Sequence, residues 1–289
     1  MPSAATVLGN AKAVDFLTER GFAGPKVAFI LGSGWGHFVD STEVVEACPY
    51  EEIPDFGAST VAGHAGRLVR GRVQIGGGAG DGSAAADESF DYLAMQGRMH
   101  RYEGHPLSRI GDAVAVLAGL GVRELVVTCA AGGVNPSYSV GDLVLIHDYI
   151  NFMLESPVRG ATPPAGSRSG TSPRMVKLAE DAAAGADIPL HRGVLFSSKG
   201  PTYETPAEVR MVRTLGGDVA SMSTAPELIA ASSLGLEAVA FACVTNMAPG
   251  VIPGAEVTHD EVIEVMQASR AKFSTLLAAL LQAFETHRP

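Results

Sequence analysis

The sequence is poor in cysteine and in basic residues. Its three cysteines, Cys48, Cys129 and Cys243, form no CxxC pair, which argues against a disulfide framework and against a zinc site. Lys and Arg total 21 against 31 acidic residues, giving a formal net charge of −10. This balance excludes a broad surface for nucleic acid or an anionic membrane, because phosphate backbones require an excess of positive charge. A small local anion site is compatible with it.

Long apolar stretches are also missing. None reaches the roughly 20 residues that a membrane-spanning helix requires. The first ten residues, MPSAATVLGN, lack the basic start and apolar centre of a signal peptide. We therefore expect a cytoplasmic protein with no membrane partner.

Charged residues make up only 18% of the chain and hydrophobic residues 46%, which excludes disorder for most of its length. The 289 residues would suffice for one large domain or two ordinary ones, at roughly 100–200 residues per domain. Since no internal repeat or linker is visible, the sequence predicts one domain over residues 1–289.

Short apolar runs alternate with helical patterns along the chain. Continuous runs of this kind are typical of buried, largely parallel strands, and they cover 26–32, 93–97, 124–133, 142–149, 193–198, 218–222 and 237–246. Helical patterns cover 109–121, 205–216 and 258–283, and capping-box sequences begin the last two at Thr205 and Thr258. The alternation predicts an α/β domain with helices on both faces of a sheet. Residues 76–89 and 156–174 have no periodicity and are predicted loops.

Two motifs carry groups suited to an anion. LGSGWG (31–36) follows a strand, where its glycines and Ser33 could hold a phosphate or simply form a tight turn. In QGRMHRYEGH (96–105), Arg98, His100 and Tyr102 alternate and would share one face of an extended chain. Such a face could hold phosphate and a sugar hydroxyl, or be the polar side of an edge strand.

Three further motifs lie at the ends of strands or helices. TCAAGGVN (128–135) ends a strongly apolar strand, where ligands of α/β sheets bind, although its glycines would also serve a close-packed turn. In GPTYETPAE (200–208), Glu204 precedes a helix cap beside Tyr203, so its carboxylate could accept N–H bonds from a ring or merely complement the helix dipole. Asn246 in VTNMAPG could donate to and accept from a ligand, or form a turn.

Two histidines complete the candidates. His259 opens the last predicted helix, where the positive end of the helix dipole favours neutral imidazole. His64, between glycines in GHAGRL (63–68), could face a cavity. Either could also be an ordinary surface or structural residue. Cys129 and Cys243 lie in apolar strands and are expected in the core.

Taken in this order, the segments resemble the trimeric class of purine nucleoside phosphorylases. The resemblance runs from about residue 8 to the last helix and rests on LGSGWG, STVAGHAGRL, MQGRMHRYEG, AAGGVNP, GPTYETPAE, SMSTAPE and VTNMA. It implies a single α/β domain around a mixed, partly barrel-like sheet. It also implies phosphorolysis of purine nucleosides to free base and ribose 1-phosphate, with phosphate as co-substrate and neither a metal nor an organic cofactor. The expected partners are small molecules and two further copies in a homotrimer.

The resemblance also implies a role for each matching position. The phosphate site would consist of Ser33, His64, Arg98, His100, the backbone at Ala130, and Ser223. The sugar site would consist of Tyr102, Met222 and His259. The base site would consist of Ala131, Gly132, Tyr203, Glu204, Ala220 and Asn246. Catalysis would depend on Asn246, Glu204, His259 and His100. The Asn246–Glu204 pair suits 6-oxopurines, that is, hypoxanthine and guanine nucleosides.

Some positions depart from the family pattern. Cys129 stands where Asn is common, and Ser221 replaces a usual Gly. The family's aromatic cap from a neighbouring subunit matches roughly 156–174, but no aromatic residue lies between Phe152 and Phe196. Either Met175 or another apolar residue replaces the cap, or the site is more open.

These departures leave other functions open. One alternative is a phosphorylase for a modified nucleoside, methylthioadenosine-like or altered at the 5′ position. Another is a purine-binding homologue without turnover. A dinucleotide-dependent oxidoreductase is the weakest, because the glycine spacing is not GxGxxG.

Overall fold

The architecture was analysed in a computed structural model that describes residues 10–61, 63–75, 88–158, 170–252 and 259–286. Within them, nine strands form one sheet in the order β2-β3-β4-β1-β5-β8-β7-β6-β9. The strands are β1 (Val27–Leu31), β2 (Glu43–Pro49), β3 (Arg67–Ile75), β4 (Glu88–Gln96), β5 (Glu124–Gly133), β6 (Leu143–Asn151), β7 (His191–Ser197), β8 (Val219–Ser221) and β9 (Glu237–Met247). β9 also pairs with β5, which closes the second half of the sheet into a barrel. This confirms the mixed, partly barrel-like sheet.

The sheet is mixed, and the strands predicted from apolar runs pair mostly in parallel. Parallel pairing joins β1 to β4 and β5, β5 to β9, and β7 to β6 and β8. Antiparallel pairing joins β2 to β3, β3 to β4, β5 to β8, and β6 to β9. The prediction of largely parallel strands is confirmed for the seven apolar runs, because five of the seven pairings among them are parallel. The other two antiparallel pairings involve β2 and β3, which no apolar run predicted.

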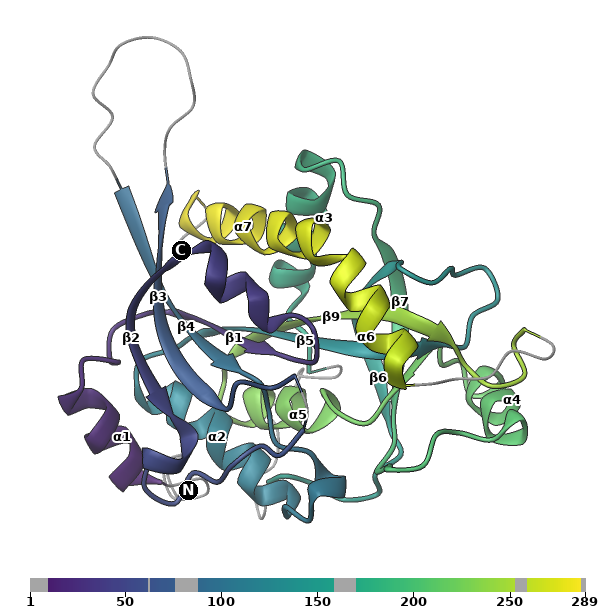
Figure 1. The fold of residues 1–289 in the computed structure, drawn as a ribbon, viewed down its shortest axis with the longest axis horizontal. Helices are drawn as coiled ribbons and strands as arrows, with labels where there is room; N and C mark the ends of the chain where they lie inside the picture. The colour runs from purple at the N-terminus through teal and green to yellow at the C-terminus, as the bar shows by residue number, and fades with distance from the viewer. Residues whose placement is uncertain (1–9, 62, 76–87, 159–169, 253–258, 287–289) are drawn as a thin grey trace, which may run out of the picture.

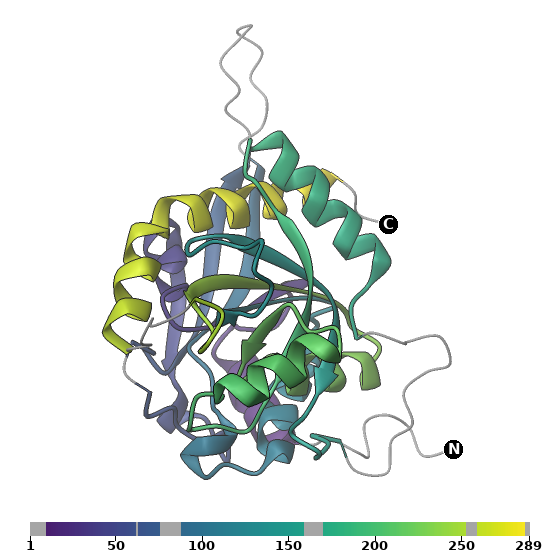
Figure 2. The ribbon, with the colours of Figure 1, turned by 90° about the vertical axis from the view of Figure 1, so that its right-hand side faces the viewer.

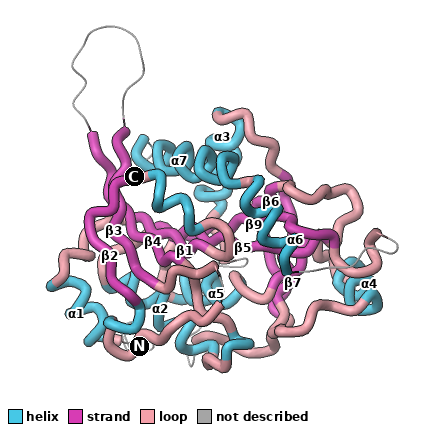
Figure 3. Tube along the Cα trace, in the orientation of Figure 1, coloured by secondary structure: helices cyan, strands magenta, loops and turns pink. Residues whose placement is uncertain are grey.

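Helices cover both faces of the sheet, as predicted (Figure 1). α3 and α7 pack together on one side, and α2 and α5 pack together on the other, with α1 against α2. Figure 2 shows α3 and α7 above the strands from a second direction, and Figure 3 shows the strands between the two layers of helices. The helices are α1 (Ala11–Glu19), α2 (Leu107–Gly119), α3 (Pro173–Gly185), α4 (Pro206–Thr214), α5 (Ala225–Ser233), α6 (His259–Ala268) and α7 (Arg270–Thr286), with 3-10 turns η2 (Gly36–Ser41), η3 (Tyr50–Glu52) and η4 (Arg101–Glu103).

The sheet separates two apolar cores, which explains why its inner strands are apolar throughout. All five residues of β1 are buried, and their side chains point alternately into the two cores. Cys129 and Cys243 are buried within these cores, as expected. In the described part of the chain, no helix has the length and apolar character to cross a membrane.

The last predicted helix, 258–283, is wrong as a single element. Ser269 separates α6 from α7, and Thr258 lies outside the described residues. Both helices contact the 31–36 loop: Gly34 lies against Met266 of α6, and Trp35 stacks on Phe273 of α7 with ring centroids 3.9 Å apart. A break between them allows both contacts.

The two predicted loops are partly wrong. Residues 76–87 and 159–169 lie outside the described part of the chain. Glu88 and Ser89, however, belong to β4, and Pro173 and Arg174 begin α3. Ser172 caps α3 by accepting a hydrogen bond from the backbone N–H of Met175. Serine before proline was therefore an available helix signal.

The predicted capping box of α4 is confirmed, with Pro206 in the first turn. The hydroxyl of Thr205 accepts from the Glu208 N–H, and the Glu208 carboxylate accepts from the Thr205 N–H at 2.7 Å. We expect Thr205→Ala to lower the free energy of unfolding by about 1 kcal/mol, measured by urea denaturation. Thr214→Ala, at the other end of α4, is the matched control and should change it by less than about 0.5 kcal/mol. Equal effects would contradict a specific role for the cap.

Candidate active site

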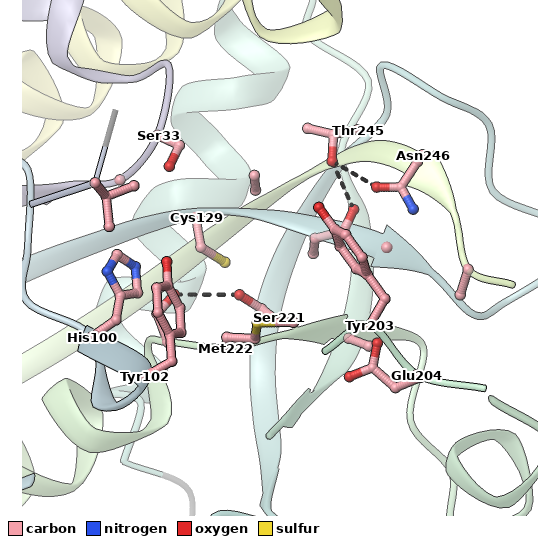
Figure 4. A pocket seen from close by; sticks show the side chains of 18 of the residues that line it. Ser33, His100, Tyr102, Cys129, Tyr203, Glu204, Ser221, Met222, Thr245 and Asn246 are labelled. Atoms are coloured by element: carbon pink, nitrogen blue, oxygen red, sulfur yellow. Dashed lines mark hydrogen bonds between the residues drawn. The ribbon is translucent and has the colours of Figure 1, made fainter. Parts of the chain in front are cut away.

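One cavity lies beside the barrel, where the loop after β1 meets β5, β8 and the end of β9 (Figure 4). It gathers residues from segments far apart in the sequence. Of the residues that the resemblance implied, thirteen line it: Ser33, Arg98, His100, Tyr102, Ala130, Ala131, Gly132, Tyr203, Glu204, Ala220, Met222, Ser223 and Asn246. In the view of Figure 4, Ser33 and His100 lie at one end, with Glu204 and Asn246 at the other.

The loop after β1 contributes Ser33 and needs glycine beside it. A Cβ on Gly32 would lie 2.5 Å from the carbonyl oxygen of Thr128, so no other residue fits there without a shift. The Gly32 N–H donates to the Thr128 hydroxyl at 3.1 Å, which ties the loop to β5. Ser33 is thereby held in the wall of the cavity, which Ala130 also lines.

His64 supports Ser33 from behind, without lining the cavity itself. Its Nε2 lies 3.2 Å from the Ser33 hydroxyl, and its Nδ1 lies 3.1 Å from the Arg98 backbone N–H. Burial, reinforced by His100 and Arg98, lowers the pKa of His64 to about 4. The ring is therefore neutral near pH 7. In the tautomer that satisfies the Arg98 N–H, Nε2–H donates to Ser33 and leaves the serine proton available to a ligand.

The neutral state of His64 gives an acid dependence of stability. The pKa of His64 is about 4 in the folded chain and 6.5 in the unfolded chain. Between these pH values the unfolded chain therefore binds more protons than the folded chain. The contribution of neutral His64 to the free energy of unfolding is fully present above pH 6.5, and it is lost as the pH is lowered toward 4. We expect urea unfolding of the native protein to lose about 1–3 kcal/mol more over this window than that of His64→Gln. Equal losses in both proteins would contradict a buried neutral ring.

Arg98, His100 and Tyr102 line the same cavity, as their alternation suggested. The chain is not extended throughout, however, because η4 begins at Arg101 and includes Tyr102. The Arg98 side chain is buried, and its Nη1 donates to Thr224 Oγ1 at 3.2 Å and Glu227 Oε1 at 3.1 Å. The cation is thus fixed beneath the cavity wall.

His100 and Tyr102 stack on one another with ring centroids 4.8 Å apart and form the next part of the wall. Nδ1 of His100 lies 3.0 Å from Glu103 Oε1. Burial alone would raise the pKa of Glu103, but hydrogen bonds from His100 and Thr60 outweigh it and hold that pKa at about 2. Glu103 is therefore an anion that orients the imidazole. Burial raises the pKa of Tyr102 to about 12, so its phenol is neutral.

The opposite end of the cavity has a carboxylate and an exposed aromatic ring. Glu204 immediately precedes the Thr205 cap and accepts from the Ser198 hydroxyl at 3.0 Å, which fixes one of its two oxygens. Tyr203 is 45% exposed, and its ring forms one side of the cavity. The arrangement leaves a carboxylate oxygen and a flat apolar surface for a planar ring that carries an N–H.

Asn246, at the end of β9, lies at the same end of the cavity as Glu204. Its Oδ1 accepts from the Thr245 hydroxyl at 3.1 Å (Figure 4), and its Nδ2 donates to the Met247 carbonyl at 3.3 Å. Gly132 pairs with Asn246 in the sheet and with Ala220 on its other side, so small residues leave space beside the amide. The site thus combines an amide and a carboxylate at one end with hydroxyls, imidazole and a cation at the other.

The central wall comes from β8 and the turn after it. Ser221 and Ser223 lie with their hydroxyl oxygens 3.3 Å apart, and the Cys129 thiol faces the same space. Burial raises the pKa of Cys129, so the thiol is neutral. The two departures from the family pattern, Cys129 and Ser221, are therefore neighbours in the cavity. Met222 lies beside them.

Sequence reasoning missed several lining residues. They have no charge or catalytic group to attract notice, and only the fold brings them in: Val61, Thr245, Ala248 and Pro249. His259 is the first residue of α6, but its side chain lies outside the described part of the structure. Among the described residues, no group of three or more His, Cys, Asp or Glu side chains could hold a metal ion.

Comparison with known proteins agrees with this geometry. The sequence matches the family model described as "Phosphorylase superfamily" over residues 26–282. The chain belongs to the phosphorylase superfamily. It is 40% identical to purine nucleoside phosphorylase 1 of Geobacillus stearothermophilus, over 94% of this chain and 96% of the relative, and 39% identical to purine nucleoside phosphorylase 1 of Bacillus subtilis, over 95% and 98%.

Its fold is shared with solved superfamily structures. Isoform 2 of purine nucleoside phosphorylase from Schistosoma mansoni, in complex with cytosine and ribose-1-phosphate, has a TM-score of 0.82 and 30% identity, covering 96% of each chain. Met175 cannot replace the aromatic cap, because its side chain lies on the inner face of α3 and is fully buried in the core. The suggestion that Met175 fills that role was wrong.

Proposed function

We propose that the protein is a purine nucleoside phosphorylase that cleaves 6-oxopurine ribonucleosides and deoxyribonucleosides, such as inosine and guanosine. The observation that carries this proposal is the polarity of one cavity. Ser33 and His100 lie at one end, where the Arg98 side chain lies against Gly32, while Glu204 and Asn246 lie at the other. An anion and a purine can occupy these ends at once, with the sugar against Tyr102 and Met222 between them. The similarity to named purine nucleoside phosphorylases supports the same assignment.

The reaction follows from where charge develops. As the bond between C1′ and N9 breaks, its electron pair goes to the purine and the sugar becomes positive. Bound hydrogen phosphate stabilises that positive charge, and one of its oxygens then forms the new bond to C1′. The proton that the hydrogen phosphate loses ends on the purine, which leaves as the neutral base. Asn246 stabilises the negative purine through N7 and O6, while Glu204 accepts from N1–H. Catalysis is therefore positioning and electrostatic preorganisation, and the protein is a pentosyltransferase with phosphate as co-substrate and no organic cofactor.

The phosphate end needs no net excess of cations in this proposal. Ser33 and Ser223 supply hydroxyl donors, His100 supplies an imidazole, and Ala130 supplies backbone. His64 acts indirectly by holding Ser33. His259 at the start of α6 is expected at the sugar 5′-hydroxyl. In this proposal, a single domain over residues 1–289 holds all of these groups. The cytoplasmic location of the protein remains a prediction.

A homotrimer remains part of the proposal. Phe152 and Leu154, which follow β6, are exposed by 39% and 78%, an unusual pairing for apolar residues on one short segment. They precede the segment that the resemblance assigns to the subunit contact, so Phe152 is our candidate for the missing aromatic cap. Sedimentation equilibrium should give three times the chain mass of 29.8 kDa. A monomer would contradict this part of the proposal.

The test is base release from several nucleosides with and without phosphate. We expect release from inosine and guanosine only when phosphate is present, and little from adenosine, whose N1 carries no proton for Glu204. Faster release from 5′-modified nucleosides would favour the modified-nucleoside alternative instead. Tight purine binding without turnover would favour the non-catalytic alternative.

A further inference from the structure

A buried ion pair beneath the phosphate end has no part in the proposed chemistry so far. Nη1 of Arg98 lies 3.1 Å from Oε1 of Glu227, and the two side chains are 2% and 3% exposed. Glu227 belongs to the SMSTAPE segment and lies in the first turn of α5. Burying both charges costs desolvation energy that their attraction often fails to recover, so stability alone is a weak reason for the pair.

The pair holds the guanidinium in one orientation. Nη1 also donates to Thr224 Oγ1, while Nη2 donates to the carbonyls of Ile30 and Thr128. Both terminal nitrogens of Arg98 are thus committed to protein acceptors. Among the described residues, Arg98 Nε has no hydrogen-bond partner, although the buried side chain lines the cavity. The donor left for a ligand is therefore Nε.

The backbone beside Glu227 is strained in a way that serves the same contact. Thr224 has φ 77° and ψ −49°, and the Ala225 N–H donates to the Ser223 carbonyl at 3.0 Å. This is a γ-turn of the rare strained type, which persists only where surrounding contacts enforce it. The turn sets Ser223 at the cavity while directing the Thr224 hydroxyl at Arg98.

We propose that Glu227 is a positioning residue for phosphate binding. Its carboxylate and the Thr224 hydroxyl fix Nη1, and this leaves the Nε edge of Arg98 facing the anion. The inference rests on the proposed function and deepens it, because it assigns the orientation of the cation to an acid that touches neither substrate. Substitution of Glu227 should therefore change the KM for phosphate far more than the KM for the nucleoside.

Position and charge are separated by two substitutions. Glu227→Asp keeps the charge but withdraws the carboxylate by one methylene. We expect it to raise the KM for phosphate about 10-fold, as for the loss of one charged hydrogen bond, while the KM for inosine changes less than about 2-fold. Glu227→Gln keeps the length and one acceptor oxygen, and its KM for phosphate should stay within about 3-fold of the native value.

Glu124→Asp is the matched control. Glu124 pairs with Arg174 away from the cavity, and its substitution should leave both KM values unchanged. Thr224→Gly is a second variant in case Glu227→Asp fails to fold. Glycine suits the positive φ, and loss of the hydroxyl should raise the KM for phosphate about 5-fold.

Several outcomes would overturn the inference. One is that Glu227→Asp has the same KM for phosphate as the native protein. If that variant does not fold, the same result for Thr224→Gly would overturn the inference. Equal increases in both KM values would indicate a merely structural role, and a larger effect of Glu227→Gln than of Glu227→Asp would indicate a counter-charge. Measurements on the native protein distinguish failure of this inference from failure of the proposed function. If inorganic phosphate neither raises its Tm nor supports base release, the proposed function fails, and this inference fails with it. A phosphate-responsive native protein with unaffected variants rejects the inference alone.

Discussion

Asn246→Ala is expected to lower kcat/KM for inosine phosphorolysis about 100- to 1000-fold. The amide is the group that meets the purine where negative charge develops, and loss of one preorganised donor of this kind costs about 3–4 kcal/mol of barrier. The side chain is already oriented before substrate arrives, because Thr245 donates to its Oδ1. Substrate therefore does not have to order the amide, and its removal should appear mainly in kcat.

The measurement is steady-state kinetics with saturating phosphate, together with a thermal unfolding curve for the variant. Asn10→Ala is the control, since Asn10 caps α1 and does not line the cavity. It should keep kcat/KM within about 3-fold, as expected for a substitution away from the site. A folded Asn246→Ala protein with native kcat would contradict the assignment of the base site.

Glu204→Gln is expected to lower kcat/KM for inosine about 10- to 100-fold. A carboxylate that accepts from a ring N–H makes a charge-assisted bond worth about 1.5–3 kcal/mol, and the amide replaces it with a weaker acceptor and a competing donor. Ser198 holds one carboxylate oxygen, so the other can point at the ring without rearrangement.

Glu208→Gln is the matched control for this variant. Glu208 lies in the first turn of α4, four residues after Glu204. Its carboxylate accepts from the Thr205 N–H, and Glu208 does not line the cavity. It should change stability slightly and kcat/KM by less than about 2-fold. If Glu204→Gln and Glu208→Gln behave alike, Glu204 does not recognise the base.

The sequence predicted the inner strands well because burial leaves a simple signal. β1, β5 and β9 are covered on both faces, so their residues are apolar without interruption. β3 gives no such signal. Its sequence, RLVRGRVQI, includes Arg70 and Arg72, which both pair with Asp91 of β4, so a polar outer face hides the strand. Only the cross-strand partner makes these arginines compatible with a sheet.

The candidate site divides in the same way. Residues with distinctive chemistry, such as Glu204 and Asn246, could be singled out from the sequence, and the fold brings them together. Arg98 was expected on an extended face, but its orientation depends on Glu227, which lies 129 residues away in the chain. Thr245 and Cys129 contribute only a hydroxyl and a thiol, so nothing local distinguishes them from core residues. Such contacts depend on the tertiary arrangement and not on any local pattern.

The central claim is transfer of the sugar to phosphate, and its most direct test is the identity of the sugar product. Inosine and phosphate would be incubated with the native protein, and the products followed by phosphorus NMR alongside hypoxanthine absorbance. The account predicts one ribose 1-phosphate for each hypoxanthine released, with no reaction when phosphate is omitted. Free ribose in place of ribose 1-phosphate, or hypoxanthine released at the same rate without phosphate, would contradict it.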